Sequence, residues 1–158
     1  MALVTMKELL HRAISENRGF GAFSVGNMEM VRGAVRAAEE MNTPIILQIA
    51  EVRFPNSPLE LMGPMMVQAA KEASVDIAVH LDHGLTLETV KKALELGFTS
   101  VMFDGSRKPF EENISCTKQV VEMAALYGAT VEAELGLVGG SEDGNCLLYT
   151  SPSPRDRS

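Results

Sequence analysis

The sequence predicts an α/β protein built on a parallel β-sheet, and three observations support this fold class. Five apolar runs typical of strands recur along the chain, and each run except the last is followed by a segment with helical periodicity. The runs are continuously apolar, which is typical of strands covered on both faces. Polar residues gather where the runs end. Periodicity alone leaves open whether the sheet is doubly wound or closed into a barrel.

The elements follow one another in a regular order after a leading helix. Thr5 and Glu8 fit a capping box ahead of helically spaced apolar residues, and Gly19 ends that pattern. The predicted strands cover residues 20–25, 45–50, 76–81, 99–104 and 130–135. The predicted helices between them cover residues 28–41, 58–73, 85–96 and 110–127. Such alternation indicates parallel strands joined by helical crossovers.

Composition and charge restrict the class of protein. The 158 residues are 46% apolar and 22% charged, which indicates one soluble globular domain. The net charge of −7 argues against nucleic acid or an anionic membrane as a partner, although a local cationic pocket stays possible. The two widely spaced cysteines predict neither a disulfide framework nor a cysteine metal cluster, so we expect a cytoplasmic protein. We expect neither a signal peptide nor a membrane-spanning segment.

The end of the chain differs from the rest. Residues 145–158 show no helical or strand period and finish in a mixture of Ser, Pro and Arg. We expect this segment to be disordered or non-native, and the domain itself to cover residues 1–144. A native flexible terminus is the alternative.

Polar residues mark the carboxyl end of every predicted strand. They are Asn27, Glu51, the pair Asp82 and His83, Asp104, and Glu134. Ionisable groups beside buried strands are costly unless they pair with one another or bind a metal. Because the carboxyl ends of parallel strands meet at one edge, where α/β folds bind ligands, we expect a functional site there.

The segment His80-Leu81-Asp82-His83-Gly84 is the densest of these clusters. His80 and Asp82 should share one face of the strand, and Gly84 permits a sharp turn after His83. A neutral imidazole is a good zinc ligand, and a neighbouring carboxylate can transfer protons. The alternative is a surface loop that happens to contain two histidines.

A second cluster contains the pair Glu132 and Glu134 on one face of the last strand. Two such carboxylates raise each other's proton affinity unless a cation lies nearby. The glycines that follow predict a mobile loop that carries Glu142. The alternative is an edge strand with solvated glutamates, and Asp104 and Asn27 have the equally simple alternative of capping a turn or helix.

The two clusters together resemble the sequence signatures of the class II fructose-bisphosphate and tagatose-bisphosphate aldolases. The first signature is His80-x-Asp82-His83-Gly84, and the second runs from Val131-Glu132-x-Glu134 through Gly139-Gly140 to Glu142. Their order, their separation and Asn27 after the first strand suit this family. The resemblance covers residues 1 to about 144 and implies a TIM barrel, (β/α)8, of which about five of the eight strands are present.

The resemblance also implies roles for the residues of the site. Asp82 would donate a proton to the aldehyde carbonyl during condensation, and His83 would bind the catalytic zinc. Asp104 and Glu134 resemble ligands of a second cation, divalent or monovalent, or of the zinc in its resting position. Zinc would stabilise the enediolate that forms when the carbon–carbon bond breaks.

The implied reaction is the reversible aldol cleavage of a ketose 1,6-bisphosphate, fructose or tagatose, to dihydroxyacetone phosphate and glyceraldehyde 3-phosphate. Glu142 resembles the loop carboxylate that transfers a proton at the ketose carbon, and Asn27 resembles a residue that contacts the substrate. The implied partners are small sugar phosphates and, at full length, further copies of the same chain.

The sequence departs from the family pattern in two respects. The family's zinc is held by three histidines, two of them beyond the fifth strand, whereas this chain has only His80, His83 and the solvent-facing His11. Ala50 stands where the family often has a serine. We therefore expect the chain as given to be a truncated and inactive amino-terminal part. Another metal-dependent barrel enzyme and a non-catalytic half-barrel that binds sugar phosphates are the alternatives.

Overall fold

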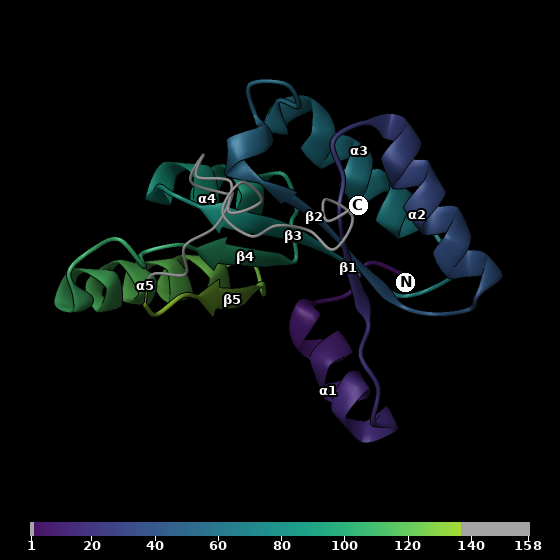
Figure 1. Cartoon of the computed structure of the whole chain (residues 1–158), viewed down its shortest axis with the longest axis horizontal. Coiled ribbons are helices and arrows are strands. Elements are labelled where there is room, and N and C mark those ends of the chain that lie inside the picture. Colours follow the sequence, from purple (N-terminus) through teal and green to yellow (C-terminus); the bar gives the residue numbers. More distant parts are fainter. Residues whose placement is uncertain (1, 137–158) are drawn as a thin grey trace, which may run out of the picture.

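The computed structural model describes residues 2–136 and is built around a single sheet of five parallel strands (Figure 1). The strands are β1 (Gly21–Ser24), β2 (Ile45–Ala50), β3 (Ile77–Gly84), β4 (Ser100–Phe103) and β5 (Thr130–Ala133). Their order in the sheet is their order in the chain, without the reversal that divides a doubly wound sheet. This confirms the predicted α/β class and matches the strand order of a TIM barrel. The predicted tail, residues 145–158, lies outside the described residues.

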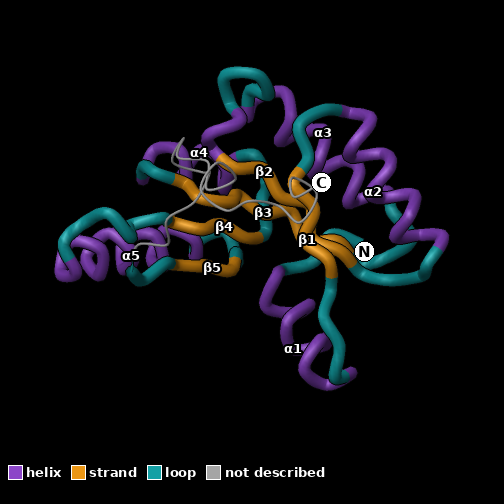
Figure 2. Tube along the Cα trace, in the orientation of Figure 1, coloured by secondary structure: helices purple, strands orange, loops and turns teal. Residues whose placement is uncertain are grey.

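One helix precedes β1, and a helix connects each strand to the next (Figure 2). The helices are α1 (Met6–Glu16), α2 (Met28–Glu40), α3 (Leu59–Glu72), α4 (Leu87–Glu95) and α5 (Phe110–Ala125), and a short 3-10 turn, η1 (Glu51–Arg53), precedes α3. Most ends lie close to the predicted ones, but β3 continues to Gly84, and η1 was not predicted. Among residues 2–136, no helix combines the length and the apolar character needed to cross a membrane.

The two faces of the sheet carry different side chains. One face packs against α2–α5 in a large apolar cluster that includes Leu47 and Ile49. Because side chains alternate along a strand, Gln48 lies on the opposite, inner face, aligned with His80 of β3 and Ser100 of β4. Strands β2, β3 and β4 are buried on both faces. Strands β1 and β5 each have one neighbour among the described strands, and β1 is exposed while β5 is partly buried.

Helix α1 covers the amino-terminal end of the inner face. Met6 and Leu9 pack against Ile46 and Ala78 in a small second apolar cluster. The backbone N–H of Lys7 donates a hydrogen bond to the hydroxyl of Thr130 on β5 at 3.0 Å. Helix α1 therefore closes the inner face at the amino-terminal end of the strands.

The predicted capping box fixes the start of α1. Thr5 Oγ1 accepts a hydrogen bond from the Glu8 N–H at 3.2 Å, and Glu8 Oε2 accepts one from the Thr5 N–H at 2.7 Å. The helix ends before Gly19, because Asn17 adopts the left-handed conformation with φ 50° and forms the C-cap. Asparagine tolerates this conformation better than most residues.

The end of β3 combines a left-handed turn at His83 with a close approach that requires glycine at position 84. His83 has a φ of 45°, in the left-handed region, and the pairing with β4 shifts its register between Leu81 and Gly84. A Cβ atom on Gly84 would lie 2.8 Å from the carbonyl oxygen of Met102 in β4. The Gly84 carbonyl accepts a hydrogen bond from the Asp104 N–H at 2.9 Å, which ties the ends of β3 and β4 together.

The substitution Gly84→Ala should destabilise the protein, because the added methyl group would force the backbones of β3 and β4 apart. We expect the free energy of unfolding to fall by about 1–3 kcal/mol. Gly33→Ala in α2 is the matched control, since nothing lies within 4 Å of the added Cβ atom. The free energy of unfolding of this variant should rise by up to about 1 kcal/mol. Urea unfolding followed by circular dichroism measures both. Equal stability of Gly84→Ala and the wild type would contradict this account of the turn.

Candidate active site

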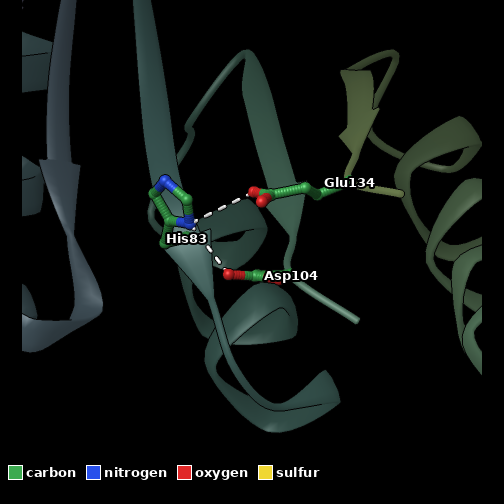
Figure 3. A group of neighbouring side chains, drawn as sticks. All are labelled: His83, Asp104 and Glu134. Carbon is green, nitrogen blue, oxygen red and sulfur yellow. Dashed lines mark hydrogen bonds and ion pairs between the residues drawn. The ribbon is translucent and has the colours of Figure 1, made fainter. Parts of the chain in front are cut away.

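Three side chains converge at the carboxyl ends of β3, β4 and β5, and we call His83, Asp104 and Glu134 the rim group (Figure 3). His83 Nδ1 lies 2.9 Å from Asp104 Oδ2 and 3.7 Å from Glu134 Oε2. One ligand atom from each residue lies within 4.8 Å of the other two. The side chains are between 16% and 28% exposed, so the group is sheltered but open to a small ligand.

The backbone positions each member of the rim group. The left-handed turn directs His83 toward the two carboxylates. Asp104 directly follows β4, and its Oδ1 accepts hydrogen bonds from the N–H of Ser106 at 3.0 Å and from its hydroxyl at 2.6 Å. Glu134 directly follows β5, and its carbonyl oxygen accepts a hydrogen bond from the side-chain amide of Asn113 in α5 at 2.8 Å. Three of the residues expected at one edge of the sheet are thus brought together there.

Electrostatics within the rim group favour a positive charge at its centre. Burial lowers the pKa of His83, but the hydrogen bond with Asp104 and the charges of Asp82, Asp104 and Glu134 outweigh burial, so the pKa is raised above its ordinary value. Burial raises the pKa of Asp104, but hydrogen bonds from Ser106 and His83 outweigh it, so the pKa is lowered. The favoured charge can be a proton on the imidazole or a bound cation.

The rim group fits a divalent cation by the chemistry of its donor atoms. An imidazole nitrogen and two carboxylates are ligands that zinc and similar cations accept. Two carboxylates that face the same point repel each other, and a cation between them removes that repulsion. Three protein ligands leave a further coordination position for another group.

Asp82 lies beside the rim group on the inner face of the sheet. Its Oδ2 accepts a hydrogen bond from Gln48 Nε2 at 3.0 Å, and the same amide donates to Ser24 Oγ at 3.1 Å. Its Oδ1 lies 3.9 Å from His83 Nε2. Sequence reasoning did not single out Gln48, although a lone polar residue inside the apolar strand Ile45–Ala50 is the signal that could have identified it.

A second histidine lies deeper in the sheet. His80 is 2% exposed, its Nδ1 lies 2.8 Å from Ser100 Oγ, and its Nε2 lies 3.4 Å from Glu132 Oε2. Burial, followed by the charge of His83, lowers the pKa of His80 to about 4, so this imidazole is neutral at neutral pH. Burial and the charge of Asp82 raise the pKa of Glu132, the direction that the sequence predicted.

The two remaining predicted site residues are not part of the rim group. Asn27 caps α2, where its Oδ1 accepts a hydrogen bond from the Met30 N–H at 2.9 Å, as the capping alternative expects. Its contact with the substrate stays a prediction. Asn27 also lines a hollow of about 240 Å³ at the carboxyl ends of β1 and β2, together with Ala50 and Arg53. Glu142 lies outside residues 2–136, and its predicted place is therefore not described.

The sequence is similar to that of a known group of enzymes. A family model described as "Fructose-bisphosphate aldolase class-II" matches residues 4–156. A fructose-bisphosphate aldolase of Thermus caldophilus is 49% identical over 141 residues, which cover 89% of this chain and 46% of that protein. A sulfofructosephosphate aldolase of Alkalicoccus urumqiensis is 43% identical over 143 residues, which cover 90% of this chain and 50% of that protein.

The fold is similar to that of solved aldolase structures. The YdjI aldolase from Escherichia coli K12 matches with a TM-score of 0.80 and 34% sequence identity, over 89% of this chain and 55% of that chain. The chain therefore spans about half the length of the proteins that it matches.

Burial of His80 should make the protein less stable in mildly acidic solution. Its pKa of about 4 lies below the ordinary value of 6.5, so the unfolded chain takes up the proton first as the pH falls. The contribution of His80 to the free energy of unfolding is complete above pH 6.5. It falls by on the order of 3 kcal/mol as the pH falls toward 4.

Urea unfolding of the wild type and of His80→Gln across this pH range measures the effect of His80. Other carboxyl groups titrate in both proteins, so the informative quantity is the stability difference between them. That difference should shift in favour of His80→Gln as the pH falls. A difference that does not change with pH would contradict the assignment.

Proposed function

Because the chain belongs to the class-II fructose-bisphosphate aldolase family, we propose that the whole protein catalyses the reversible aldol cleavage of a ketose 1,6-bisphosphate. The products are dihydroxyacetone phosphate and glyceraldehyde 3-phosphate. The observation that carries this proposal is the position of Asp82 beside the rim group, which puts a carboxylate able to transfer protons next to a set of metal ligands.

The rim group is proposed to hold the divalent cation, and zinc is the proposed ion. His83 offers a nitrogen ligand, while Asp104 and Glu134 offer oxygen ligands for this ion or for a second cation. When bound, the ion supplies a Lewis acid that polarises the substrate's carbonyl group.

Asp82 is proposed to transfer the proton on the aldehyde side of the reaction. In cleavage, its carboxylate takes the proton of the hydroxyl group on the carbon that becomes the aldehyde. The carbon–carbon bond breaks, and its electron pair stays with the dihydroxyacetone phosphate part. In condensation, the same proton returns to the aldehyde oxygen. The hydrogen bond from Gln48 keeps the Asp82 carboxylate in one orientation for both directions.

Glu142 and Asn27 complete the proposed site. Glu142 transfers the proton at the ketose carbon, and Asn27, which lines the hollow beside β1 and β2, contacts the substrate. The relatives are named for fructose bisphosphate and for sulfofructose phosphate, so the choice of sugar needs a panel of ketose phosphates that also includes tagatose bisphosphate. We further propose a cytoplasmic enzyme that assembles as a homo-oligomer.

The substitution His83→Ala should weaken the binding of zinc or cobalt by at least about 100-fold, more than the loss of an outer-shell partner costs. His11→Ala is the matched control, because His11 is exposed on α1 and away from the rim group. Isothermal titration calorimetry in competition with a chelator measures both affinities. Unchanged affinity in His83→Ala, or an equal loss in both variants, would remove the metal site from the rim group.

The substitution Asp82→Asn should lower kcat by about 100- to 10,000-fold, because the amide cannot take up the proton. Metal affinity should stay at the wild-type level, which separates loss of proton transfer from loss of the ion. A coupled assay of the whole protein, with fructose and tagatose bisphosphates and with a chelator control, measures the effect. A kcat close to that of the wild type would exclude Asp82 from the chemistry.

A further inference from the structure

Glu51 connects the end of β2 to the segment that leads into α4. It begins η1 directly after β2 and is not a member of the rim group. Its Oε2 accepts a hydrogen bond from the backbone N–H of Leu85 at 2.6 Å, and its Oε1 accepts one from the Thr89 hydroxyl at 3.0 Å. One carboxylate thus joins the connection that follows β2 to the connection that follows β3, between residues 34 positions apart in sequence.

The bond to Leu85 lies immediately beyond the left-handed turn that presents His83. The peptide group that joins Gly84 to Leu85, directly after this turn, is bound at both of its polar atoms. Its carbonyl oxygen accepts a hydrogen bond from the Asp104 N–H, and its N–H donates one to Glu51. The backbone that follows His83 is therefore held from β4 and from β2 together.

This double attachment explains how His83 keeps an unfavourable backbone conformation. A residue other than glycine keeps a φ of 45° only where contacts with the surrounding structure hold its backbone in that conformation. If the Leu85 N–H lost its acceptor, the turn could relax toward an ordinary φ and carry the imidazole away from Asp104. The rim group would then lose its only nitrogen ligand among the residues that the structure describes.

Capping of α4 is the simpler role for Glu51, since an acidic side chain near a helix start is favourable. That helix, however, already has its own cap, because Thr86 Oγ1 accepts a hydrogen bond from the Thr89 N–H at 3.0 Å. A role as a metal ligand is not indicated either, because Glu51 is not among the residues whose ligand atoms gather in the rim group.

We propose that Glu51 is a positioning residue that holds His83 in its left-handed turn and so sets the metal affinity of the rim group. The proposal rests on the proposed function in one respect only, that the rim group binds a divalent cation. Glu51 touches neither the ion nor the substrate and acts through the backbone of residues 83–85.

Three variants of the whole protein test this role by their zinc and cobalt affinities. Glu51→Ala should weaken binding by about 10- to 100-fold, as the loss of an outer-shell partner does. Glu51→Gln should restore most of the affinity, because its amide oxygen can accept from Leu85 while its amide nitrogen donates to Thr89. Glu60→Ala is the control, since Glu60 also reaches α4, through its ion pair with Lys92, and its loss should leave the affinity unchanged.

A second measurement follows His83 without metal. The ring ¹⁵N resonances of His83 report its hydrogen bond to Asp104, and those of buried His80 serve as an internal reference. Glu51→Ala should move the His83 resonances toward those of a solvent-exposed imidazole and leave those of His80 in place. Glu51→Gln should leave both unchanged.

The outcomes separate this proposal from the proposed function. Wild-type metal affinity in Glu51→Ala would overturn the positioning role. Equal weakening of metal binding in Glu51→Ala and Glu51→Gln would also overturn it, because charge rather than hydrogen bonding would then set the affinity. If the wild type binds no metal but the His83 resonances still move in Glu51→Ala, the proposed function fails while the positioning of His83 stands.

Discussion

The geometry of the rim group depends on a close approach between two backbones. The carbonyl oxygen of Met102 in β4 occupies the space that a side chain at position 84 would need. Glycine at this position lets β3 shift its register against β4, and with that shift His83 faces Asp104 and Glu134. A steric constraint between two strands thus fixes an electrostatic arrangement at the end of the sheet.

The place of the rim group could be predicted because parallel strands share one direction. Asp82, His83, Asp104 and Glu134 each end or follow an apolar run, so strand direction alone brings them to the same edge. Local patterns were equally informative where the structure is local, as in the capping box at Thr5. In the first case the run of apolar residues places each polar residue at the end of its own strand, and in the second the cap forms between residues three positions apart.

The features that sequence reasoning missed are contacts between distant segments. The bonds from Gln48 to Asp82 and from Leu85 to Glu51 each span 34 residues, and no local pattern encodes a partner at that distance. The end of β3 was placed too early for the same reason. A glycine after a histidine indicates a turn, whereas pairing with β4 carries the strand on to Gly84.

The sequential order of the strands has a consequence for the growth of the nascent chain. From β2 to β5, each strand pairs with the strand synthesised immediately before it, so each new unit meets its partner already in place as it leaves the ribosome. His83 emerges first, Asp104 follows, and Glu134 comes last. Capture of a cation by all three therefore follows the addition of β5 and cannot guide the pairing of the earlier strands.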